Sequence, residues 1–218
     1  MVQMTERDYR TQLVELGASL FARGYSVGGA GNISLRLPDD RVLATPTNSC
    51  LGRLSARDLS VADLEGNHLS GSEPTKELPL HLAVYRAKPS CGAVVHLHST
   101  YVTALSCMDG LDPGNALRPF TPYYVMKVGR LPVVPYYKPG EPMLGAEAAK
   151  IAGTVNAFLL ANHGSVVCGP SLVEAVNSAE ELEETAKLFF LLLSSGKPIR
   201  YLAENEIAGL APAKAAGA

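Results

Sequence analysis

Glycine and proline punctuate this chain so often that it must fold as short segments joined by tight connections. The sequence has 20 glycines and 15 prolines among 218 residues. Between them lie short apolar runs typical of strands and longer periodic runs typical of helices. This spacing leaves little room for a second independent core, so residues 1–210 are predicted to form one domain. The Ala-rich stretch 211–218 is predicted to be a disordered tail.

Composition and charge exclude several classes of protein. With 47% hydrophobic and 18% charged residues, the chain is expected to build a buried core, which excludes intrinsic disorder. A net charge of −2 gives no electrostatic footprint for nucleic acid or a membrane surface. No apolar run reaches the ~20 residues of a transmembrane helix, and the polar N-terminus does not resemble a signal peptide. We therefore expect a cytoplasmic protein with no nucleic-acid or membrane partner.

The cysteines do not suggest a metal site or a disulfide scaffold. The chain has four, far apart and without CxxC spacing: Cys50, Cys91, Cys107 and Cys168. Both a thiolate zinc site and a stapled secreted fold usually show closer or paired spacing. Any metal in this chain would have to use other ligands.

Periodicity and capping signals predict four helices. Thr5 and Asp8 form a capping-box pattern ahead of apolar residues with helical spacing, and Gly24 ends that segment. Ser171 and Glu174 repeat the pattern before a long helix that ends at Ser195. The other two predicted helices are Thr75–Lys88, with Thr75 as N-cap, and Thr100–Met108.

Alternating and continuous apolar runs predict the strands. Asn32–Leu37 alternates strictly, which predicts a half-buried strand, and Pro38-Asp39-Asp40 turns it into the next. The other predicted strands are Arg41–Thr45, Ser60–Leu64, Gly92–His98, Tyr124–Val128, Leu131–Tyr136, Ala157–Ala161 and Ser165–Cys168. Because hairpins interrupt the alternation of strands and helices, we predict an α/β fold: three layers, α/β/α, with a mixed, largely antiparallel central sheet.

The strongest chemical signal is His96-Leu97-His98 at the end of an apolar strand. Residues i and i+2 of a strand project from the same face about 6–7 Å apart, a separation that lets two imidazoles reach one cation. A lone histidine there would more simply be a satisfied polar residue at a strand end. The pair favours a metal site.

A metal site needs further ligands, and two residues are candidates. His163 follows the apolar run Ala157–Ala161, although alone it reads equally well as a turn histidine. Glu77 begins a predicted helix, where a carboxylate commonly interacts with the helix dipole. His68, in a polar turn, is interpreted as structural. His81, one turn beyond Glu77, is interpreted as a packed structural residue, with a place behind the metal ligands as the alternative.

Three short polar stretches suit an anion. Gly28–Asn32, Thr47-Asn48 and Thr75-Lys76 lie where loops meet regular elements. Backbone N–H groups at such junctions bind phosphate readily, and Lys76 adds a positive charge. There is no GxxxxGK[S/T] motif, so nucleotide hydrolysis is not indicated.

Taken in order, these motifs resemble the class II aldolase/adducin family from about Thr5 to Arg200. The segments that carry the resemblance are Gly29–Ser34, Thr45–Thr47, Lys76-Glu77 with His81, Ala93–Ser99 and Ala161–Gly164. The resemblance implies a homotetramer with sites near subunit contacts. It also implies one divalent metal per subunit, with zinc expected and manganese or cobalt as alternatives, held by Glu77, His96, His98 and His163. A substrate phosphate would lie near Gly31, Asn32, Thr47, Asn48, Thr75 and Lys76.

Further motifs look like the 3-oxo-tetronate 4-phosphate decarboxylase branch of that family. They are Phe21–Tyr25, Asn48–Leu54, Pro74–Glu77 and Pro119–Gly129, and Thr75-Lys76-Glu77 departs from the Ser-Ser-Glu of fuculose-phosphate aldolases. The resemblance implies that a small phosphorylated sugar acid loses CO2 through a metal-stabilised enediolate and becomes dihydroxyacetone phosphate.

In that reaction Glu77 would be the proton carrier, and Tyr124 or its neighbour Tyr123 a proton donor across a subunit contact. The alternatives are a sugar-phosphate aldolase or epimerase of the same family and, more remotely, a non-catalytic adducin-like interaction module. Retention of all four candidate metal ligands argues against the interaction module.

Overall fold

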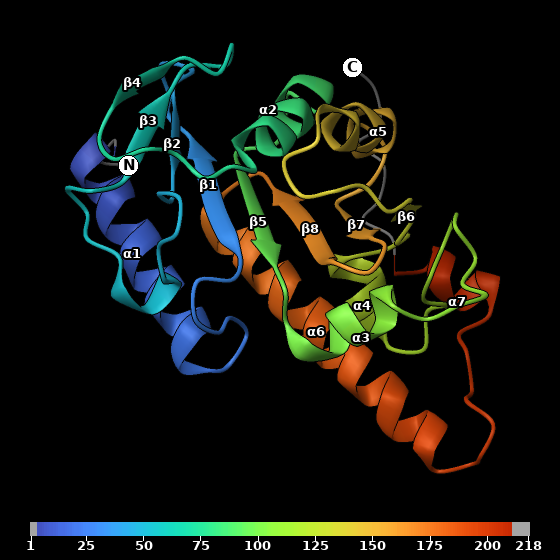
Figure 1. Ribbon diagram of the computed structural model, residues 1–218. Helices are drawn as coiled ribbons and strands as arrows, with labels where there is room; N and C mark the ends of the chain where they lie inside the picture. Colours follow the sequence, from blue (N-terminus) through green and yellow to red (C-terminus); the bar gives the residue numbers. More distant parts are fainter. Residues whose placement is uncertain (1–3, 211–218) are drawn as a thin grey trace.

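The computed structural model describes residues 4–210, which are built around one eight-stranded sheet (Figure 1). The strand order is β4-β3-β2-β1-β5-β8-β7-β6, and neighbours pair antiparallel except for the parallel pair β6–β7. The strands are β1 Asn32–Arg36, β2 Val42–Ala44, β3 Ser60–Ala62, β4 His68–Ser70, β5 Ala93–Leu97, β6 Val133–Val134, β7 Ala157–Leu160 and β8 Gly164–Gly169.

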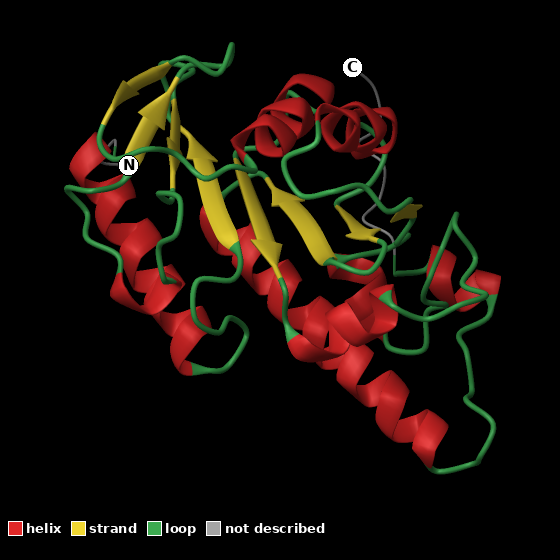
Figure 2. Ribbon diagram, viewed as in Figure 1, coloured by secondary structure: helices red, strands yellow, loops and turns green. Residues whose placement is uncertain are grey.

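Helices cover both faces of the sheet (Figure 2). One layer contains α1 Glu6–Ala22, α3 Thr100–Ser106, α4 Pro122–Lys127 and α6 Leu172–Ser194, and the opposite layer contains α2 Leu78–Ala87 and α5 Pro142–Ala152. The 3₁₀ helix η1 Leu51–Arg53 lies against α1, and α7 Glu204–Ala208 follows α6. The predicted three-layer α/β/α fold with a mixed, largely antiparallel sheet is confirmed.

The strand β1 differs from its predicted half-buried state, because both of its faces are covered. Ile33 and Leu35 face the apolar core beneath α1 and α6. Asn32 and Ser34, on the other face, are also buried, and their side chains hydrogen-bond residues at and within α2. Apolar and polar side chains therefore do alternate along β1 as predicted. The polar face of the strand, however, contacts buried polar partners rather than water.

The capping signals placed α1 and α6 correctly. The Thr5 hydroxyl accepts from the Asp8 N–H and the Asp8 carboxylate accepts from the Thr5 N–H, while the Ser171 hydroxyl accepts from the Glu174 N–H. In α2 the predicted N-cap was wrong: the helix begins at Leu78 with Glu77 as N-cap. Thr75 lies two residues before Glu77, and its Oγ1 accepts from the Glu77 N–H.

Two predicted strands were wrong or too long. Residues 124–128 lie largely in the helix α4, because Thr121 accepts from the Tyr124 N–H and Pro122 starts the first turn. Residues 131–136 contribute only Val133–Val134 to the sheet, since the prolines on either side have no N–H to donate.

Four elements had no counterpart in the sequence prediction: η1, β4, α5 and α7. His68 lies in the exposed edge strand β4 rather than in a turn. The predicted tail 211–218 lies outside the described residues. Within residues 4–210, no helix combines the length and hydropathy that crossing a bilayer demands.

A buried carboxylate from α6 fixes the point where β5 passes into α3. Glu183 is 6% exposed and accepts hydrogen bonds from the Ser99 hydroxyl at 2.8 Å, the Tyr101 N–H at 2.9 Å and the Val102 N–H at 2.8 Å. It thus satisfies the first N–H groups of α3, as a cap from another element. The residue before this junction is His98.

Replacing Glu183 with Gln should lower the free energy of unfolding by about 1–3 kcal/mol, because the neutral amide weakens three buried hydrogen bonds. Thermal and urea unfolding measure this. The matched control is Glu184→Gln on the same helix, whose half-exposed side chain should change stability by less than about 0.5 kcal/mol. Equal losses in the two variants would contradict the capping role.

Candidate metal centre

The four predicted ligands come together at one end of the central strands. Glu77 is the N-cap of α2, His96 lies in β5, His98 follows it, and His163 lies in the turn between β7 and β8. One ligand atom from each lies within 4.8 Å of the others. Segments separated by as many as 86 positions thus supply a single cluster.

The ligand atoms face a common point. The Nε2 atoms of His98 and His96 are 2.9 Å apart, the His96 Nε2 lies 3.3 Å from Glu77 Oε2, and the His163 Nε2 lies 3.6 Å from Glu77 Oε1. The three rings are mutually edge-on, with centroids 4.6–4.9 Å apart. Edge-on imidazoles direct their nitrogen lone pairs inward, as metal ligands do.

The backbone of β8 orients His96. Its Nδ1 lies 2.7 Å from the Ser165 carbonyl oxygen, which can only accept, so Nδ1 carries the proton. Nε2 is then left with its lone pair toward the cluster. A carbonyl or carboxylate behind a ligating histidine is the usual way in which proteins fix its tautomer.

Burial and mutual charge set the protonation states. Burial, with His96 and His163 nearby, lowers the pKa of His98 to about 4, and burial also lowers the pKa of His163. Burial alone would lower the pKa of His96, but the Glu77 carboxylate holds it above its ordinary value. Burial would raise the pKa of Glu77, but His96 and the Asn32 amide hold it well below its usual range.

The residues fit a divalent cation. Glu77 Oε1 is buried and has no hydrogen-bond partner, a costly arrangement for a carboxylate oxygen unless a positive charge satisfies it. Three imidazoles and a carboxylate form a nitrogen and oxygen donor set that zinc and its neighbours in the first transition row accept.

Strand register explains the convergence. Asn32 of β1 is paired with His96 of β5, so both side chains point toward α2. Gly31, just before β1, adopts a φ of +78°, and a Cβ there would lie 2.9 Å from the His96 carbonyl oxygen. Only glycine allows this close approach of the two strands beside the cluster.

A cavity of about 180 Å³ adjoins the cluster, and the six predicted phosphate-binding residues all line it. Glu77 and His98 connect it to the metal ligands. Three lining residues lie outside the stretches predicted to bind an anion: Pro46, Ser49, and Pro139 from the loop between β6 and α5. The full lining is Gly29, Ala30, Gly31, Asn32, Pro46, Thr47, Asn48, Ser49, Thr75, Lys76, Glu77, His98 and Pro139.

Backbone strain marks the same cavity. Asn48 adopts a φ of +55°, in the left-handed region that residues other than glycine rarely occupy. Asparagine tolerates this conformation better than most residues do. The Asn in the Thr-Asn-Ser loop was therefore the one feature of the sequence that could have indicated the left-handed backbone here.

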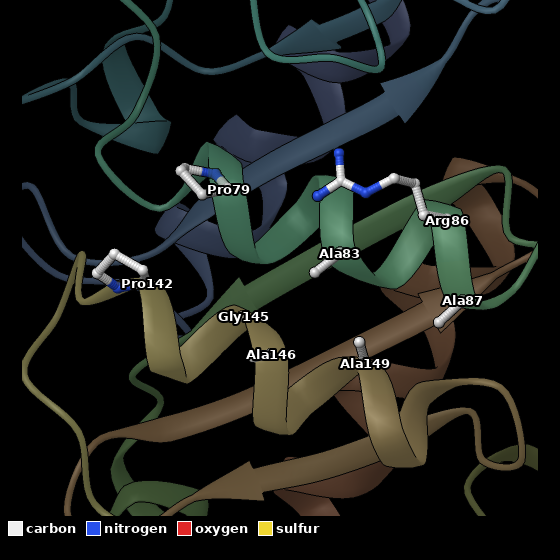
Figure 3. A pocket seen from close by; sticks show the side chains of 8 residues that line it. All are labelled: Pro79, Ala83, Arg86, Ala87, Pro142, Gly145, Ala146 and Ala149. Atoms are coloured by element: carbon white, nitrogen blue, oxygen red, sulfur yellow. The ribbon is translucent and has the colours of Figure 1, made fainter.

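A larger hollow of about 610 Å³ lies between α2 and α5 (Figure 3). Arg86 is its one charged lining residue, and its guanidinium donates to the Leu64 carbonyl oxygen. None of the four candidate metal ligands lines it. Its walls are otherwise small and apolar: Pro79, Ala83, Ala87, Pro142, Gly145, Ala146 and Ala149.

The structure does not bring Tyr124 to the metal cluster. Its side chain is fully buried in the core, where its hydroxyl donates to the Leu117 carbonyl oxygen at 3.1 Å. A hydroxyl held in this way cannot reach across to another subunit, so the structure does not support Tyr124 as proton donor. Tyr123, the alternative from the sequence, is 63% exposed.

The chain belongs to the class II aldolase and adducin N-terminal domain family, whose model matches residues 11–190. It is 58% identical to a 3-oxo-tetronate 4-phosphate decarboxylase of Haemophilus influenzae, over 95% of this chain and 98% of that protein. An L-fuculose phosphate aldolase of Methanococcus maripaludis is 36% identical over 84% of this chain and 96% of that protein. The crystal structure of YgbL from Klebsiella pneumoniae superposes with a TM-score of 0.93 at 57% identity, covering 95% of this chain and all of that one.

Acid should destabilise the metal-free protein, and His81 should account for part of the loss. Burial lowers the pKa of His81 to about 3, while an unfolded histidine titrates near pH 6.5. Between these pH values His81 binds a proton in the unfolded chain but not in the folded one. The free energy of unfolding therefore falls as the pH drops from about 6.5 toward 3. His81→Gln should show a shallower decline in the urea midpoint than the parent. Parallel declines in the two proteins would contradict the assignment.

Proposed function

We propose that this protein decarboxylates 3-oxo-tetronate 4-phosphate, releasing CO2 and dihydroxyacetone phosphate, with one divalent metal ion per subunit. The observation that carries the proposal is the convergence of Glu77, His96, His98 and His163 beside a cavity that holds Lys76. The similarity to decarboxylases over nearly the full chain supports the choice of substrate.

We propose zinc as the metal, because an imidazole-rich, thiol-free donor set with an orphaned carboxylate oxygen suits it. When bound, the ion supplies positive charge that polarises the substrate ketone and stabilises the negative charge developing as CO2 leaves. We further propose a homotetramer acting in the cytoplasm. Exposed apolar side chains on α4 and the end of α6 support an assembly, among them Tyr123, Met126, Leu191 and Leu193.

The loops around the cavity would bind the phosphate. Gly31, Asn32, Thr47, Asn48 and Thr75 surround it with backbone N–H groups and short polar side chains. We place Lys76 on the phosphate rather than on the carboxylate. A cation clamped on the departing carboxylate would stabilise the ground state more than the transition state.

Glu77 would carry the proton. When the bond between C1 and C2 breaks, its electron pair stays on C2 and C3 as an enediolate, and C2 must then gain a proton. Glu77 Oε2 is held by the Asn32 amide at 2.8 Å, whereas Oε1 has no hydrogen-bond partner and is free to take a proton from water and deliver it to C2. The reaction then consumes one solvent proton for each CO2 released. Substrate that displaces the carboxylate from the imidazoles also makes it more basic.

The alternative donor of that one proton to C2 is a tyrosine of a neighbouring subunit, and we assign this role to Tyr123, which is exposed where Tyr124 is not. A short helix, α4, presents it. A side chain that acts across a subunit contact must lie at the surface of its own subunit, and Tyr123 meets this requirement.

The purified protein should release CO2 from 3-oxo-tetronate 4-phosphate and lose that activity on treatment with a chelator, with recovery on adding Zn²⁺. Fuculose 1-phosphate and rhamnulose 1-phosphate serve as comparison substrates, with aldehyde release followed separately. Faster aldehyde release from either would show a sugar-phosphate aldolase instead, like the 36% identical L-fuculose phosphate aldolase of Methanococcus maripaludis. A chelator-insensitive enzyme would contradict the metal site.

Replacing Glu77 with Gln should lower kcat at least about 100-fold, because the amide cannot carry a proton. Zn²⁺ content, measured by elemental analysis, separates loss of metal from loss of proton transfer. The control is Glu73→Gln, whose side chain lies outside the cluster and the 180 Å³ cavity. A Glu77→Gln enzyme with unchanged Zn²⁺ content and unchanged turnover would refute the proton-carrier role.

A further inference from the structure

A line of hydrogen bonds runs from Glu77 away from the imidazoles, into the space between β1 and α2. Asn32 Nδ2 donates to Glu77 Oε2 at 2.8 Å, and Asn32 Oδ1 lies 2.6 Å from His81 Nε2. On the other side of the ring, His81 Nδ1 lies 2.7 Å from Ser34 Oγ, which lies 2.8 Å from the Tyr85 hydroxyl. The line joins two strand residues to three residues at or within α2.

The carboxylate sets the direction of every bond in this line. Glu77 Oε2 only accepts, so the Asn32 amide must turn its NH2 group toward Glu77 and its oxygen toward His81. His81 Nε2 must then carry the proton. A neutral imidazole has one N–H, so Nδ1 accepts from Ser34, whose oxygen accepts in turn from Tyr85.

The side chains of these inner residues make no hydrogen bond to a candidate metal ligand. Ser34 and His81 are fully buried, Tyr85 is 1% exposed, and none of them lines the 180 Å³ cavity. Burial lowers the pKa of His81 to about 3 and raises the pKa of Tyr85 well above its ordinary value. Both side chains therefore keep one protonation state near neutral pH, which argues for a role in orientation rather than in proton transfer.

We propose that His81 is a positioning residue: its Nε2–H holds the Asn32 amide in the orientation that donates to Glu77, which keeps Glu77 Oε1 directed at the imidazoles. The inference rests on the proposed function, since orienting Glu77 matters for activity only if Glu77 binds metal and carries a proton. It favours, for His81, the place behind the metal ligands that the sequence analysis left as the alternative to a structural role.

Loss of His81 acts through the Asn32 amide. Without the Nε2–H, Asn32 Oδ1 is a buried acceptor with no donor, and the two orientations of the amide come closer in energy. The flipped orientation sets an oxygen against Glu77 Oε2, which repels the carboxylate from its place. Glu77 then occupies its ligand position for a smaller fraction of the time.

Two variants separate the hydrogen bond from the space that the ring fills. His81→Gln places an amide N–H near the position of Nε2, whereas His81→Leu fills the space without a donor. With Zn²⁺ as the probe and a chromogenic chelator as competitor, the dissociation constant should rise about tenfold in His81→Leu and stay within about threefold of the parent in His81→Gln, as expected for a group behind a metal ligand. kcat should follow the same order, with KM little changed.

Val61→Ala, a truncation in β3 away from the cluster, controls for general loss of stability. It should lower the melting temperature without changing the Zn²⁺ dissociation constant. Equal Zn²⁺ affinity in His81→Gln and His81→Leu, or a matching loss in Val61→Ala, would overturn the proposal. If the parent does not decarboxylate the substrate but the order of Zn²⁺ affinities holds, the proposed function fails while the positioning role stands.

Discussion

The main physical constraint on this structure is an ionised carboxylate that is buried away from water. Glu77 is only 9% exposed, and removing a charge from water costs several kcal/mol unless partners replace the lost solvation. The Asn32 amide satisfies one oxygen and the imidazole of His96 approaches it, but the second oxygen has no hydrogen-bond partner. That imbalance is the physical reason for expecting a cation among the three histidines. The same protein without metal would hold a strained, incompletely satisfied charge.

The sheet provides the precision that such a site requires. β1 and β5 are neighbours although about 60 positions separate them in sequence, and their register sets Asn32 opposite His96 and Ser34 opposite Val94. A slip of one residue would turn every side chain of a strand to the other face. Every second residue of β1 from Ile33 and of β5 from Ala93 faces the core that α1 and α6 cover, which penalises such a slip strongly. Hydrophobic burial on one face of the sheet thereby fixes the polar geometry on the other.

How far the sequence could predict this molecule depended on whether the signal was local. The caps at Thr5 and Ser171, the apolar strand before His98 and the ligands themselves are marked by neighbouring residues, and the structure contains them as expected or groups them together. The strand predicted for residues 124–128 was wrong. Aromatic and β-branched residues there favour a strand, but Thr121 and Pro122 start a helix. The line from Asn32 to Tyr85 was beyond prediction. Periodicity assigns Ser34 and His81 to faces of their elements but does not say that those faces meet.

The distribution of charge around the cavity bears on the type of reaction. Among its lining residues Lys76 is the one lysine or arginine, and His98, with its pKa lowered to about 4, is neutral. A substrate with a phosphate and a carboxylate therefore finds one fixed cation from this chain for two anionic groups. If Lys76 binds the phosphate, the substrate carboxylate has no cationic side chain among the lining residues left to pair with it. The charged protein group beside it is then the carboxylate of Glu77. Such a setting is less favourable for the charged substrate carboxylate than for neutral CO2. Binding energy gained at the phosphate therefore offsets a destabilised ground state at the carboxylate, which lowers the barrier to breaking the bond. In an aldolase the departing group is uncharged both before the bond breaks, as an alcohol, and after it, as an aldehyde, so an aldolase gains nothing from this asymmetry. The Thr75-Lys76-Glu77 sequence therefore bears on the choice of leaving group.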